Sequence, residues 1–330
     1  MEHHKHSDVL IIGAGISGLM AATKLQESGI SVTVLDKGRH YGGRMATRAF
    51  DGAIFDHGAQ FFTVRDHRFQ VAVESAVAAG FVTQWKPNMG TFQDHQPIAS
   101  PDHQARFVGH PYMNSLGRFL SQDIEIQTES RVQMVEPNGD LFRLILTSQE
   151  TLTADCVLVT APVDQMVAML QHFDVEQLGS RFAMDPTWTT VLSVEEPLRG
   201  SAGESFDALF GGDHPLFDFI AVENSKPGRQ SNFIVVHATP EWSTKHLESD
   251  PAEISELIRE AFSETFQVTT QARLSHRWRY ARPTNPKVTA QKGIYQVSPN
   301  LWVAGDYLAG GRVEGAYLSG LEAAEHILAR

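Results

Sequence analysis

Three glycines near the amino terminus are spaced so that a phosphate-bearing ligand could lie against bare backbone. Gly13, Gly15 and Gly18 follow the apolar run 9–12, as expected where a buried strand turns sharply into a helix. Gly13 permits the turn, Gly15 lets phosphates approach the main chain, and Gly18 lets helix and strand pack closely. The helix start, which includes Ser17, offers backbone N–H groups and partial positive charge to an anion.

A carboxylate follows at the position where a ribose would lie. The second apolar run, residues 32–35, leads into Asp36, whose oxygens can accept hydrogen bonds from ribose hydroxyls. The glycine motif alone is weak evidence. The order of strand, glycines, helix, strand and acid predicts a dinucleotide site, with NAD and FAD both allowed.

Two further segments favour FAD over NAD. The glycine-rich stretch 37–44 extends past Asp36 and ends in Arg44, which can bind a phosphate through two hydrogen bonds. Near the carboxyl terminus, residues 300–304 read as a strand that leads to Gly305 and Asp306 and then to a helix. An aspartate there can bind a ribityl chain, and the helix start can polarise a ring carbonyl.

The combination of these motifs resembles the FAD-binding architecture of the flavin amine-oxidase superfamily, and within it the renalase-like branch. The segments that carry the second resemblance are residues 55–63 (FDHGAQFFT), 276–281 (HRWRYA), 305–307 and 311–316. The resemblance spans nearly the whole chain. It implies an α/β Rossmann-type FAD-binding domain, discontinuous in sequence, with a second α+β substrate domain of the amine-oxidase fold.

The resemblance also implies which residues contact FAD, with Asp36 at the adenosine ribose and Arg39 and Arg44 near the pyrophosphate. The residues expected to bind the cofactor are Gly13, Gly15, Ser17, Gly18, Asp36, Lys37, Arg39, Gly43, Arg44, Gln60, Phe61, Val132, Trp278, Gly305, Asp306, Glu314, Gly315 and Ala316. The single cysteine, Cys156, lies in an apolar strand far along the chain from the flavin loop. We therefore expect the FAD to be non-covalent.

The implied reaction is oxidation of isomeric dihydronicotinamide dinucleotides, the 2- and 6-dihydro forms of NAD(P), to NAD(P)+. Electrons pass to O2 and give H2O2, in a metabolite-repair role. Hydride transfer from such a ring needs orientation and a dry pocket more than a base. At or near predicted strand ends, Thr187, Trp188, Asn224 and His237 are the candidate substrate residues, although His237 also fits a core histidine.

Two other functions stay open at this point. Amine oxidases of the superfamily use a lysine near the flavin, and Lys226, Lys287 and Lys292 all read as exposed. Their exposure weakens, without excluding, the alternative of a flavin amine oxidase that acts on a small amine or polyamine substrate. A flavoprotein without oxidase turnover is the other alternative. Asp56 reads as a structural cap or turn acid.

Composition limits the partners. The formal net charge is -12 over 330 residues, which argues against broad binding to nucleic acid or to anionic membranes. No apolar run reaches the ~18 residues of a membrane span. One cysteine allows no internal disulfide, and the amino terminus lacks the apolar core of a signal peptide. We expect a cytoplasmic protein that binds a small molecule and O2.

Hydrophobic periodicity predicts the elements that position these residues. Helices are expected over 69–79, 163–171, 251–265 and 315–329, and strands near 124–126, 131–135, 141–146, 155–161, 189–194, 217–222 and 233–238. Four prolines make residues 85–113 look irregular or hairpin-like. We expect the FAD-binding domain to comprise residues 1–65, 114–163 and 286–330, and the substrate domain residues 66–113 and 164–285.

Overall fold

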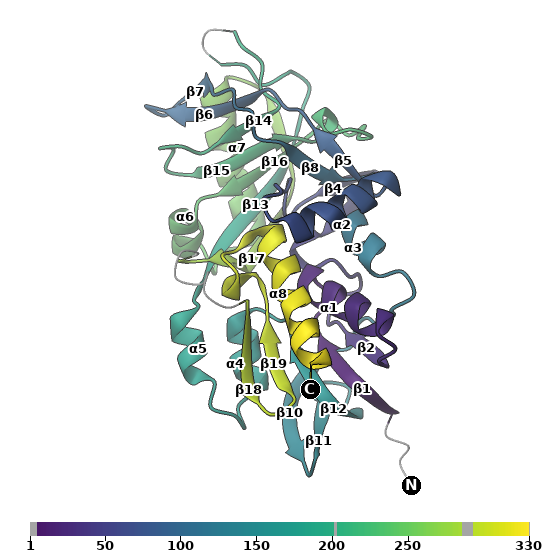
Figure 1. The fold of residues 1–330 in the computed structure, drawn as a ribbon. Coiled ribbons are helices and arrows are strands. Elements are labelled where there is room, and N and C mark those ends of the chain that lie inside the picture. The colour runs from purple at the N-terminus through teal and green to yellow at the C-terminus, as the bar shows by residue number, and fades with distance from the viewer. Residues whose placement is uncertain (1–4, 201–202, 286–292, 330) are drawn as a thin grey trace.

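Two large sheets occupy opposite halves of the molecule in the computed structural model, which describes residues 5–200, 203–285 and 293–329 (Figure 1). The first sheet has eight strands. They are β1 (Lys5–Ile12), β2 (Val32–Leu35), β9 (Glu125–Gln127), β10 (Val132–Asn138), β11 (Leu141–Leu146), β12 (Thr151–Val159), β18 (Ile294–Ser298) and β19 (Leu301–Ala304).

The centre of the first sheet is parallel, with β1 between β2 and β12 and with β19 on the other edge of β12. All four residues of β2 and of β19 are buried, as expected for a parallel sheet covered on both faces. Helices α1 (Ile16–Glu27) and α8 (Arg312–Leu328) pack on one face. Helices α4 (Val163–Met169) and α5 (Glu176–Arg181) contribute to the core on the other.

Small residues allow α1 and α8 to approach each other closely. A Cβ at Gly320 of α8 would lie 2.1 Å from the Ser17 carbonyl oxygen of α1, and a Cβ at Gly18 would lie 2.0 Å from the Gly13 oxygen. No side chain fits at either position. Gly18 was expected to let helix and strand pack closely, and the structure shows why: only a residue without a side chain allows α1 to contact the Gly13 backbone.

The second sheet has seven strands in the order β17-β13-β16-β15-β14-β6-β7. They are β6 (Met89–Gln93), β7 (Gln96–Ala99), β13 (Met184–Val194), β14 (Ala208–Phe210), β15 (Phe217–Val222), β16 (Phe233–Ala238) and β17 (Thr270–Pro283). Helices α6 (Pro240–Lys245) and α7 (Pro251–Phe266) pack on one face through residues such as Ile254, Ile258 and Phe262. The other face contributes to the site described below.

Shorter elements join the two halves. They are η1 (Gly43–Met45), β3 (Thr47–Phe50), β4 (Ala53–Asp56), α2 (His67–Ala78), β5 (Val82–Trp85), β8 (Arg106–Gly109), α3 (Ser115–Leu120), η2 (Glu223–Ser225) and η3 (Asp306–Leu308). The aromatic ring of Phe69 in α2 packs on Tyr317 of α8, with 5.0 Å between ring centroids. Helix α2 thus shares a core with the first sheet, although the expected boundary after residue 65 separates them.

The sequence predicted most elements and their types. The expected helices correspond to α2, α4, α7 and α8, and the expected irregular region 85–113 contains the hairpin β6–β7. Cys156 is buried in β12, as expected. The main difference is β17, which runs for 14 residues, whereas only the aromatic cluster near its centre stood out in the sequence.

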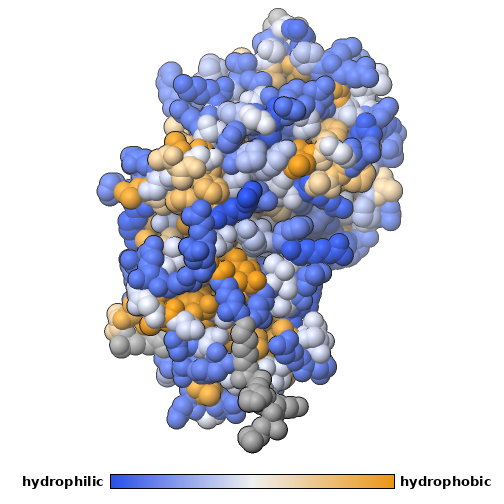
Figure 2. Space-filling model, turned by 90° about the vertical axis from the view of Figure 1, so that its right-hand side faces the viewer, coloured by the Kyte–Doolittle hydropathy of each residue, from blue (hydrophilic) through white to orange (hydrophobic). Residues whose placement is uncertain are grey.

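The surface seen in Figure 2 is largely hydrophilic, with apolar residues in separate patches. Among the described residues, no helix has both the length and the apolar character needed to cross a membrane.

Candidate active site

A row of side chains crosses four strands of the second sheet on the face opposite α7. His237 of β16 is the register partner of Thr189 on β13 and of Phe219 on β15, and Thr189 is also the partner of His276 on β17. Directly paired residues share one face of a sheet. Phe219, His237, Thr189 and His276 therefore project together toward the loop that follows β4.

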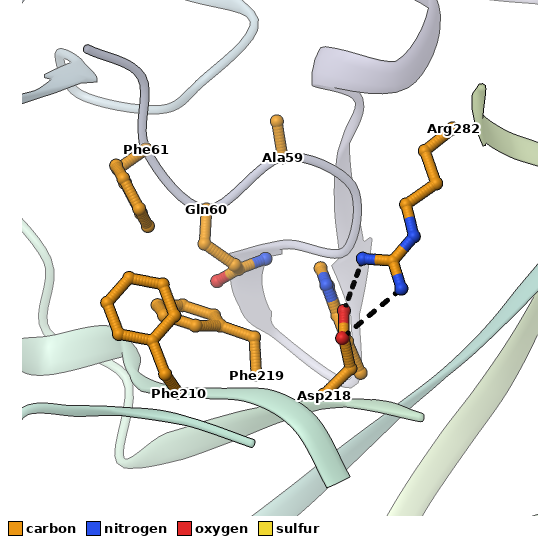
Figure 3. A pocket seen from close by; sticks show the side chains of 8 residues that line it. Ala59, Gln60, Phe61, Phe210, Asp218, Phe219 and Arg282 are labelled. Carbon is orange, nitrogen blue, oxygen red and sulfur yellow. Dashed lines mark hydrogen bonds and ion pairs between the residues drawn. The ribbon is translucent and has the colours of Figure 1, made fainter. Parts of the chain in front are cut away.

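That loop borders an open cavity of about 280 Å³ beside the row. Figure 3 shows Ala59, Gln60 and Phe61 on the loop side, facing residues of the second sheet. The remaining lining residues are Phe210, Asp218, Phe219, His237 and Arg282. One wall is aromatic, with Phe61 and Phe219 rings 5.5 Å apart, and the other wall is polar.

Three histidines at this site are neutral at physiological pH. Burial lowers the pKa of His237 to about 3, assisted by the charges of Lys226 and Arg282. Burial likewise lowers the pKa of His57 to about 3, with His276 the next cause. The Nδ1 of His57 and the Nε2 of His237 are buried without a hydrogen-bond partner among the described residues. These atoms can bind a polar group of a ligand.

His57 also organises an aromatic cluster beside the cavity. Its ring stacks on Trp278 at 5.2 Å and meets the edge of His276 at 4.9 Å. The Trp278 indole Nε1 donates a 2.9 Å hydrogen bond to the His57 carbonyl oxygen. Trp278, an expected cofactor residue, is thereby fixed against the loop that carries Gln60.

A buried cluster of four charged residues supports the loop from behind. Arg229 pairs with Asp56 at 2.5 Å, and Lys226 pairs with Glu223, all with no side-chain exposure. Burial raises the pKa of Glu223, although the adjacent Lys226 charge opposes this shift. Asp56 also accepts from the Met113 backbone N–H, so the expected structural acid is part of this buried ion-pair cluster.

Gln60 is held by the same cluster. Lys226 Nζ donates to Gln60 Oε1 at 2.8 Å, and Gln60 Nε2 donates to the carbonyl oxygens of Asp56 and Gly58 at 2.7 and 2.9 Å. Both ends of the amide are therefore engaged by protein. Gln60 lines the cavity in one fixed orientation.

Lys226 corrects an expectation from the sequence. It was expected to be exposed because it lies in a polar loop, but it is only 1% exposed. The reason is the helical turn η2, which brings Glu223 and Lys226 to one buried side of the segment. Because Lys226 is buried beside the cavity, the expected exposure of this lysine is no longer an argument against an amine oxidase. Lys287 and Lys292 lie outside the described residues.

Of the four expected substrate residues, only His237 lines the cavity. Thr187 is buried on the same face of β13 as Thr189, and it pairs with Trp278. Trp188 lies on the opposite face, where its Nε1 donates to the His246 carbonyl oxygen, because adjacent strand residues point to opposite faces. Asn224 is exposed and donates to Asn232. These positions do not support direct roles for Trp188 and Asn224.

The first glycine loop fits a bound pyrophosphate. A Cβ at Gly15 would meet no heavy atom within 4 Å, and α1 begins without a side-chain cap. The Ser17 hydroxyl is buried without a hydrogen-bond partner among the described residues. Gly43 packs beside Gly15, since its Cβ would lie 3.2 Å from the Gly15 Cα. Open space and unsatisfied donors therefore meet at one helix N-terminus.

The expected ribose acid also holds the loop together. Asp36 accepts 2.7 Å hydrogen bonds from the backbone N–H groups of Ala14 and Gly38, and each carboxylate oxygen keeps a lone pair for another donor. Lys37 donates to Gln165, and the exposed Arg39 lies 3.7 Å from Glu129. Val132 is buried at the start of β10.

The carboxyl-terminal motif is tied to the first loop by an ion pair. Nη1 and Nη2 of Arg44 both donate to Asp306, and Nη1 also donates to the Ala281 carbonyl oxygen. Glu314 accepts from the backbone N–H groups of Arg65 and Asp66, so its carboxylate fixes the start of α2. The Gly305 N–H donates to Ser319.

Close packing follows at the start of α8, where a Cβ on Gly315 would lie 2.5 Å from the Ala309 oxygen. Ala316, also in α8, is partly buried against the core that α8 shares with α1. The parts of the motif thus lie on one side of the first sheet. The donors and free space at this site fit a dinucleotide cofactor.

A larger cavity lies elsewhere, between α8, β18 and β19. Its volume is about 610 Å³, and Trp302, Glu322 and His326 are among its lining residues. None of the residues expected from the sequence to bind cofactor or substrate lines it. Size alone would favour this cavity, but the chemistry favours the smaller one.

Several site residues were missed from the sequence. Asp218, Arg282, Phe210 and Phe219 line the cavity, but they come from three strands whose register a single sequence does not reveal. The i, i+2 spacing of Phe217 and Phe219 would have placed both rings on one face of a regular strand. A bulge between them instead turns Phe217 into the core beneath α7 and leaves Phe219 at the cavity.

Comparisons with family models match two parts of the chain. The model described as "NAD(P)-binding Rossmann-like domain" matches residues 11–74. The model described as "Flavin containing amine oxidoreductase" matches residues 88–328, which is more than half of the chain.

Similar curated proteins match only a short segment. Mitochondrial protoporphyrinogen oxidase of Nicotiana tabacum is 42% identical over 62 residues, and hydroxyneurosporene desaturase of Rubrivivax gelatinosus is 44% identical over 57 residues. These matches cover 19% and 17% of the chain and 12% and 11% of the relatives.

Solved structures match over nearly the whole chain. A protein assigned as a protoporphyrinogen oxidase, from Exiguobacterium sp. 255-15, superposes with a TM-score of 0.77 at 14% identity over 99% of both chains. Wild-type putrescine oxidase bound to putrescine superposes with a TM-score of 0.71 at 14% identity, covering 98% of this chain and 99% of the other. At this identity the likeness concerns the fold.

Gly15→Ala tests the pyrophosphate site. The backbone of Gly15 is extended, so alanine should fold normally, but its methyl group would occupy the open space at the helix start. We expect thermal stability of the apoprotein to be unchanged and FAD affinity to fall about tenfold or more. Fluorescence titration of apoprotein with FAD measures this. Gly179→Ala in α5, which meets only Val167 at 3.5 Å, is the control; equal affinity in both variants would contradict the site.

His57→Gln tests the neutral histidines. An unfolded chain protonates histidine near pH 6.5, whereas His57 in the folded protein has a pKa of about 3. The unfolded state therefore binds the proton first, and stability falls as the pH drops from about 6.5 toward 3. At pH 5 His57 alone should lower the free energy of unfolding by roughly 2 kcal/mol.

Urea unfolding at pH 7 and pH 5 measures this effect. The loss between the two pH values should be smaller in His57→Gln by that amount, while the exposed His103→Gln control should behave as the wild type. Identical pH dependence of stability in His57→Gln and wild type would show that the pKa of His57 is not lowered in the folded protein.

Lys226→Met tests the buried charge cluster. Removing Nζ leaves the buried Glu223 without its nearest cation, which should cost about 3–5 kcal/mol of unfolding free energy. The double variant Glu223→Gln with Lys226→Met should recover part of the loss. Lys245→Met, at an exposed position of α6, should change stability by about 0.5 kcal/mol or less. If Lys226→Met loses no more unfolding free energy than this control, the buried pair of Lys226 and Glu223 does not stabilise the fold.

Proposed function

The chain belongs to the flavin-containing amine oxidoreductase family, and we propose that it is an FAD-dependent oxidase of isomeric dihydronicotinamide dinucleotides. The substrates are the 2- and 6-dihydro forms of NAD(P), and the products are NAD(P)+ and H2O2. This activity would return inhibitory isomers to the usable cofactor pool, as in the renalase-like branch that the sequence resembles.

The proposed reaction removes a hydride from the dihydropyridine ring, which becomes the aromatic pyridinium of NAD(P)+. FAD, held at the glycine loop that begins α1, would supply the two-electron acceptor for this hydride, with O2 as the final oxidant. Overall, the dihydro dinucleotide, O2 and one proton give NAD(P)+ and H2O2. Since the ring nitrogen supplies the electronic push, the protein need only bind, orient and exclude water.

The charge of the cavity carries the proposal. Asp218 is the single carboxylate among the described residues that line it, and Arg282 neutralises it through hydrogen bonds of 2.9 and 3.3 Å. His237 is neutral because burial lowers its pKa to about 3. A protonated amine would find the one carboxylate of the cavity already paired with Arg282, whereas the neutral ring of a dihydronicotinamide needs no counter-ion there.

The shapes of the side chains also suit a flat ring with a carboxamide. Phe219 and Phe61 offer aromatic faces for stacking. On the polar side, the His237 Nε2 lacks a protein partner among the described residues and can accept a hydrogen bond from a carboxamide NH2. The cavity volume of about 280 Å³ suits one ring system, so the rest of the dinucleotide would extend outward.

An amine oxidase is the second candidate. The observation that favours it is the buried Lys226, whose Nζ lies 2.8 Å from Gln60 Oε1 at the cavity wall. A lysine close to the flavin is a feature of amine oxidation in this superfamily. Against it, Lys226 is already paired with Glu223 and Gln60.

Anaerobic reductive titration of the holoenzyme separates the two candidates. Adding 6-dihydroNAD should bleach the flavin absorbance near 450 nm within seconds, because the hydride donor needs no deprotonation. Putrescine and benzylamine at the same concentration should leave the spectrum unchanged, and admitting O2 after bleaching should give one H2O2 per flavin. Bleaching by an amine and not by dihydronicotinamide isomers would support the amine oxidase instead.

A further inference from the structure

We propose that Arg282 binds a phosphate group of the dinucleotide substrate by exchanging its ion pair with Asp218 for one with the phosphate. This inference rests on the proposed function, since it names which part of the substrate the residue recognises. Arg282 would thus be a specificity residue that favours nucleotides over the corresponding nucleosides.

The present partner of Arg282 occupies the positions that phosphate oxygens would take. Nη1 and Nη2 donate separately to the two carboxylate oxygens of Asp218 (Figure 3). A guanidinium fork of this kind binds phosphate with the same paired geometry. The Asp218 carboxylate therefore holds Arg282 in the conformation needed for a phosphate.

The pair is accessible and easily exchanged. The Arg282 side chain is 44% exposed and that of Asp218 is 29% exposed. An ion pair in contact with water contributes little net stability, because both ions are well solvated when they separate. The pyrophosphate of the dinucleotide, with one negative charge on each phosphate, can then compete for the guanidinium.

Two other cations near the cavity, Arg106 and Lys226, are committed elsewhere. Arg106 lies beneath Phe61 and Phe210 with its side chain 5% exposed, and it binds Asp102 through two 2.7 Å hydrogen bonds. Lys226 is fully buried with Glu223. Among the described residues that line the cavity, Arg282 is the single permanent cation.

The backbone places Arg282 next to the expected ring site. It lies near the end of β17, where the preceding carbonyl oxygen, that of Ala281, accepts a hydrogen bond from Arg44. Its register partner on β13 is Asp185. Arg282 and His237 line the same cavity, so a substrate whose ring reaches His237 can extend its phosphates toward Arg282.

The test compares a hydride donor that carries phosphates, as part of its ADP moiety, with one that carries none. Steady-state oxidation of 6-dihydroNAD and of 6-dihydronicotinamide riboside is measured in wild type, Arg282→Met, Asp218→Asn and the control Arg279→Met. Arg279 lies on the same strand but pairs with Glu248. Flavin absorbance and melting temperature show that each variant is folded and loaded.

We expect Arg282→Met to raise KM for the dinucleotide about tenfold and to leave both the riboside kinetics and kcat nearly unchanged. Asp218→Asn removes the competing carboxylate, so KM for the dinucleotide should fall severalfold. In wild type, added salt should raise KM for the dinucleotide and not for the riboside.

Equal effects of Arg282→Met on both donors, or no effect on either, would overturn this inference and leave the proposed function intact. A wild-type enzyme that oxidises neither donor would reject the proposed function and this inference with it.

Discussion

The buried charges behind the loop after β4 are the interaction on which the site depends. Asp56 is the last residue of β4 and Gln60 belongs to this loop. Glu223, Lys226 and Arg229 come from the segment that joins β15 to β16 in the second sheet. Buried ions must be paired closely, because an unpaired charge in the interior is costly. The ion pairs and the hydrogen bond from Lys226 to Gln60 therefore fix the loop against the second sheet. The cavity is the space that remains between the loop and the sheet.

The same burial determines the chemistry of the cavity. Low exposure lowers the pKa of His57 and His237 to about 3 and that of His276 to about 4, so three imidazoles face the site as neutral groups. The charges of Lys226 and Arg282 reinforce the shift of the His237 pKa. A cavity of this kind favours a neutral ring, and the exposed Arg282 adds a preference for an anionic tail.

Sequence reasoning succeeded where the signal is local. The glycine spacing, Asp36 and the final Gly305 and Asp306 identified the cofactor motifs, because each needs only a turn and the helix that follows. It failed where the answer depends on the phase of a turn or on strand register. The turn η2 exposes Asn224 and buries Lys226, the reverse of what was expected, and Trp188 faces α6. Asp218 of β15 meets Arg282 of β17 although β16 and β13 lie between these strands in the sheet.

The central claim is that the cavity between the loop and the second sheet binds the nicotinamide ring of a dinucleotide. A crystal structure of the FAD-loaded protein with bound NAD+, the proposed product, tests this most directly. We expect the nicotinamide ring between Phe219 and the loop, with its carboxamide at His237 and a phosphate within hydrogen-bond distance of Arg282. A nicotinamide ring bound outside this cavity, or a cavity that binds a protonated amine in preference to NAD+, would contradict the account.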